Sequence, residues 1–100
     1  MNNQFEHKVV FITGAANGIG KAAADLFSER GAKLALCDVN EDLLKDVHNN
    51  YQSRGIDVIS KKVGVTNKSK LFEFTEDIIS KFGNLDVCIP ILPPIPVLAV

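Results

Sequence analysis

The feature that most constrains this chain is the glycine-rich stretch at residues 13–20, T-G-A-A-N-G-I-G. Residues 8–12 before it are mostly apolar and β-branched, which is typical of a strand, and residues 21–27 after it are typical of a helix. Glycines let a backbone turn sharply and approach a ligand closely, and a helix N-terminus offers free N–H groups and a partial positive charge. The strand, turn and helix therefore predict a phosphate-binding site.

Two phosphate-binding motifs can be compared with this stretch. A P-loop requires G-x-x-x-x-G-K-[ST], but the window that ends in Gly20 and Lys21 begins with an alanine and is followed by another. It therefore lacks the hydroxyl that would hold magnesium. The dinucleotide pattern G-x-G-x-x-G/A fits Gly18, Gly20 and Ala23. A glycine-rich turn without a ligand is the alternative, and the flanking strand and helix disfavour it.

Gly14 extends the pattern to T-G-x-x-x-G-I-G. This longer pattern resembles the cofactor loop of the short-chain dehydrogenase/reductase family, and the resemblance covers residues 8 to 89. It implies hydride transfer between an alcohol or ketone and NAD as the family reaction. It also implies that the turn binds the pyrophosphate and ribose of NAD through Gly14, Asn17, Gly18, Ile19 and Gly20.

Asp38 ends a second apolar run, residues 33–37, and stands eighteen positions after Gly20. The acidic residue that binds the adenosine ribose in dinucleotide-binding folds lies about 20 residues past the glycines. A carboxylate there can accept hydrogen bonds from both ribose hydroxyls and would repel a 2′-phosphate, which favours NAD over NADP. The alternative is a surface aspartate that begins a turn before a helix.

The adenine contact departs from the family pattern. Relatives carry a D-V pair after the third strand, where this chain has Gly64 and Val65. We expect Val65 to line the adenine pocket without the carboxylate acceptor. Asp57 or Asn67 could replace that acceptor only in part, and their spacing disfavours it.

The chain alternates four strand patterns with three helix patterns. Right-handed crossovers then predict an α/β fold with a partial doubly wound parallel sheet, Rossmann-like, in the order 3-2-1-4. The expected strands are residues 8–13, 33–38, 57–63 and 85–89, and the third should lie near an edge because it is more polar. The helices should begin at Gly18, at an Asn40 cap and at a Thr66 or Asn67 cap, and end before Gly31, Gly55 and Gly83. The expected buried faces are Ile19, Ala22, Ala23, Leu26 and Phe27; Leu43, Leu44, Val47 and Tyr51; and Leu71, Phe72, Thr75, Ile78, Ile79 and Phe82.

The resemblance stops after Ile89. The family continues with N-N-A-G, whereas residues 90–93 here are P-I-L-P. The family's catalytic serine and Y-x-x-x-K pair have no counterpart, because Tyr51 is the only tyrosine and Gly55 follows four residues later. We therefore predict that residues 1–89 form the N-terminal part of a dinucleotide-binding domain.

Residues 90–100 hold all four prolines and no charge, which predicts a disordered or loosely packed tail. Their P-x-x-P spacings could alternatively suit an SH3-like groove, but no basic residue flanks them.

Composition limits the partners. The net charge is −1 with no basic stripe, so nucleic-acid binding is not expected. The polar N-terminus and the lack of a long apolar run predict no leader or membrane span, and hence a cytoplasmic protein. Cys37 and Cys88 lie far apart in the sequence, each inside an apolar run, so buried free thiols are expected, with a disulfide as the alternative. No metal site is expected. Two hypotheses remain: an NAD-binding fragment, or a non-catalytic chain that folds poorly or pairs with a full-length homologue through the edge of its fourth strand.

Overall fold

The computed structural model describes residues 4–16, 18–64 and 66–90, in which strands and helices alternate. The predicted tail beyond Pro90 lies outside these residues. In chain order the elements are β1 (Val9–Thr13), α1 (Gly18–Glu29), β2 (Lys33–Asp38), α2 (Glu41–Ser53), β3 (Val58–Lys62), α3 (Lys68–Phe82) and β4 (Val87–Pro90).

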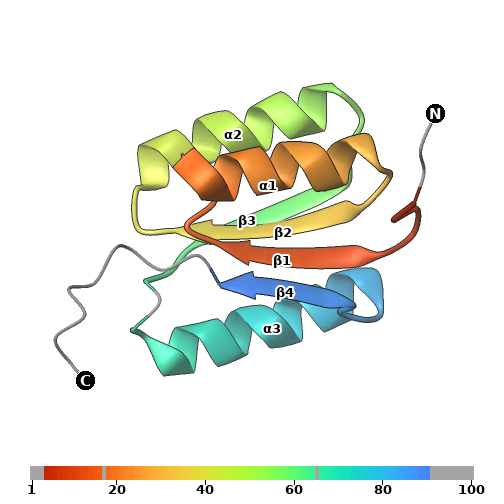
Figure 1. Ribbon diagram of the computed structural model, residues 1–100. Coiled ribbons are helices and arrows are strands. Elements are labelled where there is room, and N and C mark those ends of the chain that lie inside the picture. The colour runs from red at the N-terminus through yellow and green to blue at the C-terminus, as the bar shows by residue number, and fades with distance from the viewer. Residues whose placement is uncertain (1–3, 17, 65, 91–100) are drawn as a thin grey trace, which may run out of the picture.

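The four strands form one parallel sheet in the order β3-β2-β1-β4. This confirms the predicted strand order, and β3 lies at an edge as its polarity indicated. The register pairs Phe11 of β1 with Ala35 of β2 on one side and with Cys88 of β4 on the other. The chain therefore runs from β1 toward β3 and then returns to the other side of β1 for β4 (Figure 1).

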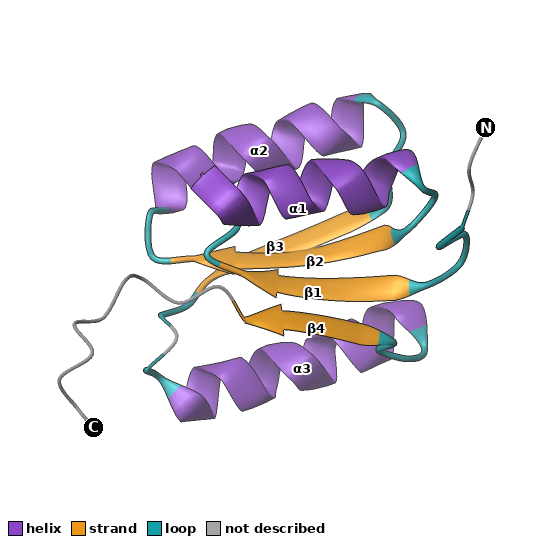
Figure 2. Cartoon of the chain, viewed as in Figure 1, coloured by secondary structure: helices purple, strands orange, loops and turns teal. Residues whose placement is uncertain are grey.

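The sheet is a middle layer between helices. Helices α1 and α2 cover one face, and α3 alone covers the other (Figure 2). The central strands β1 and β2 are buried on both faces, so alternate residues enter two separate cores. Val10 and Ile12 belong to the core between the sheet and helices α1 and α2, whereas Val9 and Phe11 belong to the core between the sheet and α3.

Both proposed N-caps are present. The Asn40 side chain accepts the Leu43 N–H at 3.1 Å, and the Asn67 side chain accepts the Lys70 N–H at 3.1 Å. Asn67 rather than Thr66 therefore caps α3. Gly83 ends α3 in the left-handed conformation, with φ of 91°.

Strand boundaries differ by one or two residues from the prediction. β1 begins at Val9 and β4 at Val87. Asp86, just before β4, bonds to β1 through both its side chain and its backbone. The Asp86 Oδ2 atom accepts the Val9 N–H at 2.9 Å, and the Asp86 N–H donates to the Val9 carbonyl at 3.0 Å. Pro90, which we expected in the tail, is instead the last residue of β4, an edge strand where proline is tolerated.

The predicted buried faces of α1 and α3 are partly wrong. Gly20 and Ala24 are the buried residues of α1, while Ile19 is 73% and Leu26 45% exposed. On α3 the buried residues are Phe74 and Ile78, and two residues of the predicted face, Phe72 and Ile79, are 65% and 48% exposed. In α2 the prediction is confirmed for Leu44, Val47 and Tyr51, whereas Leu43 is exposed.

The exposed apolar residues of α1 and α3 lie toward the same edge of the sheet, the edge formed by β4. Asp25 of α1 bonds to α2, so Ile19 and Leu26, on the opposite flank of α1, face away from α2. Lys61 of β3 pairs with Glu73 and Asp77 of α3, so Phe72 and Ile79 lie on the flank of α3 away from β3.

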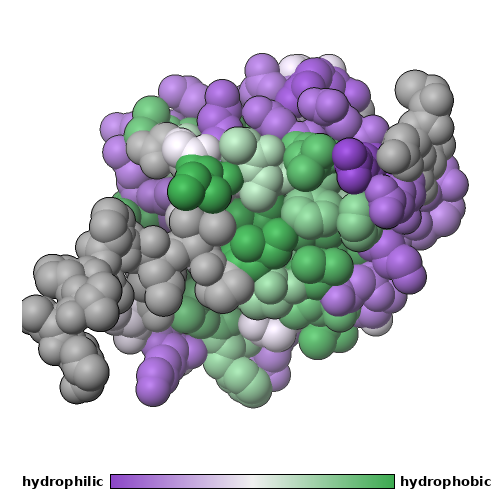
Figure 3. All heavy atoms as spheres, in the orientation of Figure 1, coloured by the Kyte–Doolittle hydropathy of each residue, from purple (hydrophilic) through white to green (hydrophobic). Residues whose placement is uncertain are grey.

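Figure 3 shows apolar side chains gathered between α1 and α3, where β4 lies. We call Ile19, Leu26, Phe72 and Ile79 the β4-edge band. Within the described ranges, no helix is long and apolar enough to cross a membrane.

Candidate functional site

The carboxyl ends of the four parallel strands lie together at one end of the sheet, toward which the arrowheads point in Figure 1. The glycine-rich turn leaves β1 at this end and leads into α1. Its Ala15 N–H donates to the Cys37 carbonyl at 3.1 Å, so the turn lies across the end of β2. The sheet order reverses direction beside β1, and ligands of open α/β sheets bind at such a point.

The turn has the backbone shape that its glycines predict. Gly14 and Gly18 have φ of 66° and 59°, a conformation that side chains disfavour. Among the described residues, a Cβ atom at Gly18 would meet nothing within 4 Å, so this part of the chain leaves the space above the turn open. Gly18 and Ile19 are exposed at the first turn of α1, where free N–H groups face that space.

Gly20 has a different environment. A Cβ atom there would lie 2.0 Å from the Gly14 carbonyl oxygen, and Gly20 itself is buried. This glycine lets α1 pack directly on the turn, whereas the space in front of Gly18 is free for a ligand.

Asp38 brings a carboxylate to the turn. Its Oδ2 atom accepts the Ala16 N–H at 3.0 Å, and its Oδ1 atom accepts the Asn40 N–H at 2.9 Å. Each carboxylate oxygen has two lone pairs, so both oxygens can accept further hydrogen bonds. The structure therefore brings together Gly14, Gly18, Ile19, Gly20 and Asp38. Asn17 and Val65 lie outside the described residues.

The segment after β3 lies beside the end of β2. A Cβ atom at Gly64 would be 3.3 Å from Cγ1 of Val39, whose side chain is 66% exposed. Val39 thus offers apolar surface next to Asp38, and the sequence analysis missed it. Its position directly after the ribose-binding candidate is the signal that could have identified it.

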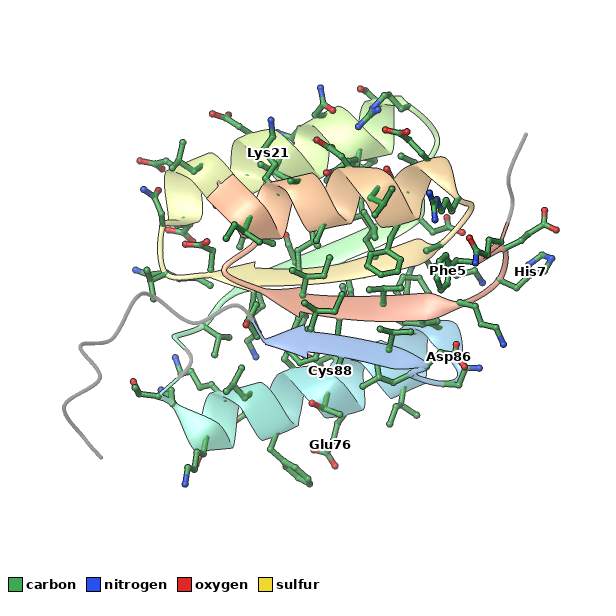
Figure 4. The ribbon with its side chains drawn as sticks, viewed as in Figure 1. Phe5, His7, Lys21, Glu76, Asp86 and Cys88 are labelled. Carbon is green, nitrogen blue, oxygen red and sulfur yellow. The ribbon has the colours of Figure 1, made fainter. Side chains whose placement is uncertain are left out.

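The two substitutes considered for the missing adenine acceptor lie in different places. Asp57 precedes β3 and so lies at the opposite end of the sheet. The Asn67 side chain is engaged by the Lys70 N–H. The labelled residues Phe5, His7 and Asp86 also lie at that opposite end, far from the turn (Figure 4).

Tyr51 is not placed for proton exchange with a ligand. It is 1% exposed, and its hydroxyl donates to the Asp25 Oδ1 atom at 2.5 Å between α1 and α2. Burial raises the pKa of Tyr51 above its usual value of 10.0, and the hydrogen bond to Asp25 raises it further. The hydroxyl therefore stays protonated and holds two helices together.

The two cysteines are free thiols, as expected, but they differ in exposure. Cys37 is buried, and burial together with the charge of Asp38 raises its pKa to about 12. Cys88 is exposed on β4, where we predicted a buried thiol (Figure 4). It is exposed because β4 is an edge strand with no further strand beside it among the described residues.

Comparison with known proteins identifies the family. The family model described as short chain dehydrogenase matches residues 8–90. The chain belongs to the short-chain dehydrogenase family. The turn at residues 13–20 and the sheet order described above both lie within the matched range.

Relatives with curated descriptions and solved structures agree with this assignment. The chain is 35% identical over 85 residues to a CLA biosynthesis dehydrogenase/reductase of Lactiplantibacillus plantarum, covering 85% of this chain and 30% of that protein. It is 40% identical over 83 residues to the short-chain dehydrogenase/reductase aba4 of Botryotinia fuckeliana, covering 82% of this chain and 32% of that protein. The chain thus spans about a third of the length of these relatives.

A crystal structure of a short-chain dehydrogenase/reductase from Burkholderia phymatum in complex with NAD superposes with a TM-score of 0.82 at 31% identity, covering 84% of this chain and 30% of that one. A crystal structure of hydroxysteroid dehydrogenase from Escherichia coli gives a TM-score of 0.80 at 30% identity, covering 86% of this chain and 37% of that one.

Proposed function

We propose that this chain binds NAD through the adenosine and pyrophosphate half of the cofactor. The observation that carries the proposal is the Asp38 carboxylate, which is hydrogen-bonded to the Ala16 amide of the glycine-rich turn. A ribose acceptor and a pyrophosphate-binding turn are thereby adjacent, in the order in which the cofactor presents its ribose and phosphates. The open space at Gly18 and the free N–H groups of α1 would receive the pyrophosphate.

The same carboxylate supports NAD rather than NADP. A 2′-phosphate would approach the negative charge of Asp38, and repulsion between like charges would oppose it. Val39 beside Asp38 would contact the adenine ring, and we keep Val65 as a further proposed contact. Asn17 is also kept as a proposed contact to the cofactor.

Catalysis by the 100-residue chain alone is not part of the proposal. NAD, when bound, supplies the hydride acceptor of the family reaction. A general acid must then exchange a proton with the substrate oxygen, and the chain has no Y-x-x-x-K pair to do so. Tyr51 is buried between two helices and cannot replace it.

Substitution of Gly18 tests the binding proposal. Valine at Gly18 would fill the open space in front of the turn, so binding of ADP-ribose should be lost in isothermal titration. Gly55→Val is the matched control, because Gly55 also has a positive φ, 79°, and also meets nothing within 4 Å, but lies in the turn after α2. Both substitutions impose the same backbone strain, and only the first should abolish binding. A Gly18→Val chain that folds by circular dichroism and still binds ADP-ribose would refute the proposal.

A second function, pairing with another polypeptide, is favoured by the edge of β4. Asp86 directs its main-chain N–H to Val9 of β1, and alternate residues of a parallel strand face opposite neighbours. The main-chain groups of Val87 and Ile89 therefore face away from the sheet. With the β4-edge band on both flanks, this edge would suit a strand and helices of a homologous chain.

A pair of leucine substitutions tests this second function. Leu26 lies in the β4-edge band and is 45% exposed, and Leu43 of α2 lies outside it and is 38% exposed. If the edge pairs with another chain, Leu26→Lys should abolish association in sedimentation velocity, alone or mixed with a full-length relative, and Leu43→Lys should not. A parent chain that sediments as a monomer in both experiments would exclude the pairing.

A further inference from the structure

We infer that Asp38 is a positioning residue for the glycine-rich turn as well as a ribose acceptor, so that its carboxylate couples the two halves of the bound cofactor. The inference rests on the proposed NAD-binding function and assigns a second role to one of its residues. It follows from the hydrogen bonds that this carboxylate makes without any ligand.

The turn is held to the end of β2 by two consecutive amides. The Ala15 N–H donates to the Cys37 carbonyl, and the Ala16 N–H donates to the Asp38 Oδ2 atom. Ala15 is fully buried and Ala16 is 3% exposed, so this part of the turn packs into the core. A buried N–H without an acceptor is costly, and the carboxylate of Asp38 is the acceptor that the Ala16 N–H uses.

The carboxylate is itself held from a second side. Its Oδ1 atom accepts the Asn40 N–H at the start of α2, which leaves the plane of the group little freedom. Hydrogen bonds to a charged acceptor are stronger than those between neutral groups. The remaining lone pairs of both oxygens can accept the ribose hydroxyls. One group thus shapes the pyrophosphate turn and receives the ribose.

Asparagine at position 38 separates the two roles. It has the shape of aspartate but offers one acceptor oxygen and one NH₂ donor. Either the Ala16 N–H or the Asn40 N–H would then face a donor, and the other would keep a neutral acceptor in place of the charged one. The bond that holds the turn is therefore lost or weakened in both cases. If Asp38 only bound ribose, the same substitution would leave the turn unchanged.

Amide hydrogen exchange of the free protein provides the first test. In Asp38→Asn, the Ala16 amide should exchange about tenfold faster than in the parent chain, as expected for the loss of one charge-assisted hydrogen bond. The Ala15 amide is the internal control, because its acceptor is a backbone carbonyl. Asp46→Asn, at an exposed position of α2, removes the same charge without touching the turn. Unchanged exchange at Ala16 in Asp38→Asn would overturn the inference.

Cofactor analogues provide the second test. NAD that lacks the adenosine 2′- and 3′-hydroxyls cannot bond to the Asp38 carboxylate through the ribose. Asp38→Asn should nevertheless weaken binding of this analogue about tenfold, because the turn that receives the pyrophosphate is altered. Equal affinity of the parent and Asp38→Asn for the analogue would overturn the coupling. If the parent bound neither NAD nor the analogue, the proposed function would fail, and the exchange result would decide whether Asp38 shapes the turn.

A measurement on the unsubstituted chain covers the case in which Asp38→Asn does not fold. A scalar coupling across the hydrogen bond, between the Ala16 nitrogen and the Asp38 carboxylate carbon, should be detectable by NMR in the parent protein. Its detection would support the positioning role, and its absence while the Ala15 amide couples to the Cys37 carbonyl would refute that role.

Discussion

At the scale of single residues, burial decides which side chains can do chemistry. Tyr51 and Cys37 have the reactive groups of many enzymes, yet both are buried. Removal from water disfavours their charged forms, so the pKa of each is raised. Asp38, by contrast, lies at the carboxyl ends of the strands, where backbone amides donate to both oxygens of its carboxylate.

The tyrosine offers a direct optical test. It is the only tyrosine, and the chain has no tryptophan, so phenolate absorbance reports on Tyr51 alone. We expect the folded chain to ionise well above pH 10, and the chain in concentrated urea to ionise near pH 10. Ionisation of the folded chain at or below pH 10, with circular dichroism unchanged, would contradict both the burial of Tyr51 and its hydrogen bond to Asp25.

The pH dependence of stability has a defined sign. Above pH 10 the unfolded chain releases the Tyr51 proton while the folded chain keeps it, so this contribution to stability decreases as pH rises. It is fully present below pH 10. Tyr51→Phe should be less stable than the parent by about 1 kcal/mol in urea denaturation at pH 7. The difference should shrink above pH 10, and a difference that grows there would contradict the account.

Single-residue spacing predicted part of the site and could not predict the rest. Gly14, Gly18 and Asp38 could be proposed from the sequence because each role requires a particular residue type at a particular distance along the chain. The bond from Ala16 to Asp38 was not found, because it joins residues 22 positions apart and depends on how the turn crosses β2. The proximity of Val39 to Gly64 was not predicted for the same reason, since Gly64 follows a different strand.

At the scale of elements, α1 is positioned by the glycine that touches the turn. The Gly20 backbone lies against the Gly14 carbonyl, so the start of the helix and the turn form one unit. Helical periodicity located α1 but not its buried side. The apolar residues of α1 cover both the flank that faces the sheet and the flank that faces the β4 edge, and periodicity alone does not separate the two.

Alanine at Gly20 tests this packing. Because the new Cβ would collide with a carbonyl oxygen, Gly20→Ala should destabilise the fold by about 3 kcal/mol in urea denaturation. Gly55→Ala, which meets only backbone strain, should cost about 1 kcal/mol. A Gly20→Ala chain as stable as Gly55→Ala would show that α1 does not rest on the turn.

At the scale of the whole molecule, the sheet is covered by helices on both faces but exposes apolar residues along its β4 edge. Alternation of strands and helices was enough to predict the order 3-2-1-4, because crossover handedness leaves few arrangements. The exposure of the β4-edge band could not be predicted, since it depends on what lies beside β4. Two helices cover one face of the sheet and one covers the other.

We predict that the 100-residue chain alone does not catalyse hydride transfer. No side chain among its residues matches the family's Y-x-x-x-K pair, so hydride transfer lacks its general acid. A purified, monodisperse sample should form no NADH above background with a broad panel of secondary alcohols. Turnover that persists after host dehydrogenases are removed would mean that another group performs the acid's role.

Isothermal titration with NAD and NADP tests the central claim most directly. If Asp38 receives the adenosine ribose, NAD should bind about tenfold more tightly than NADP, a difference of about 1.4 kcal/mol. The 2′-phosphate is the only difference between the two ligands, so the comparison isolates the site beside Asp38. Equal affinities, or tighter binding of NADP, would contradict the assignment of Asp38 to the ribose and the proposed preference for NAD.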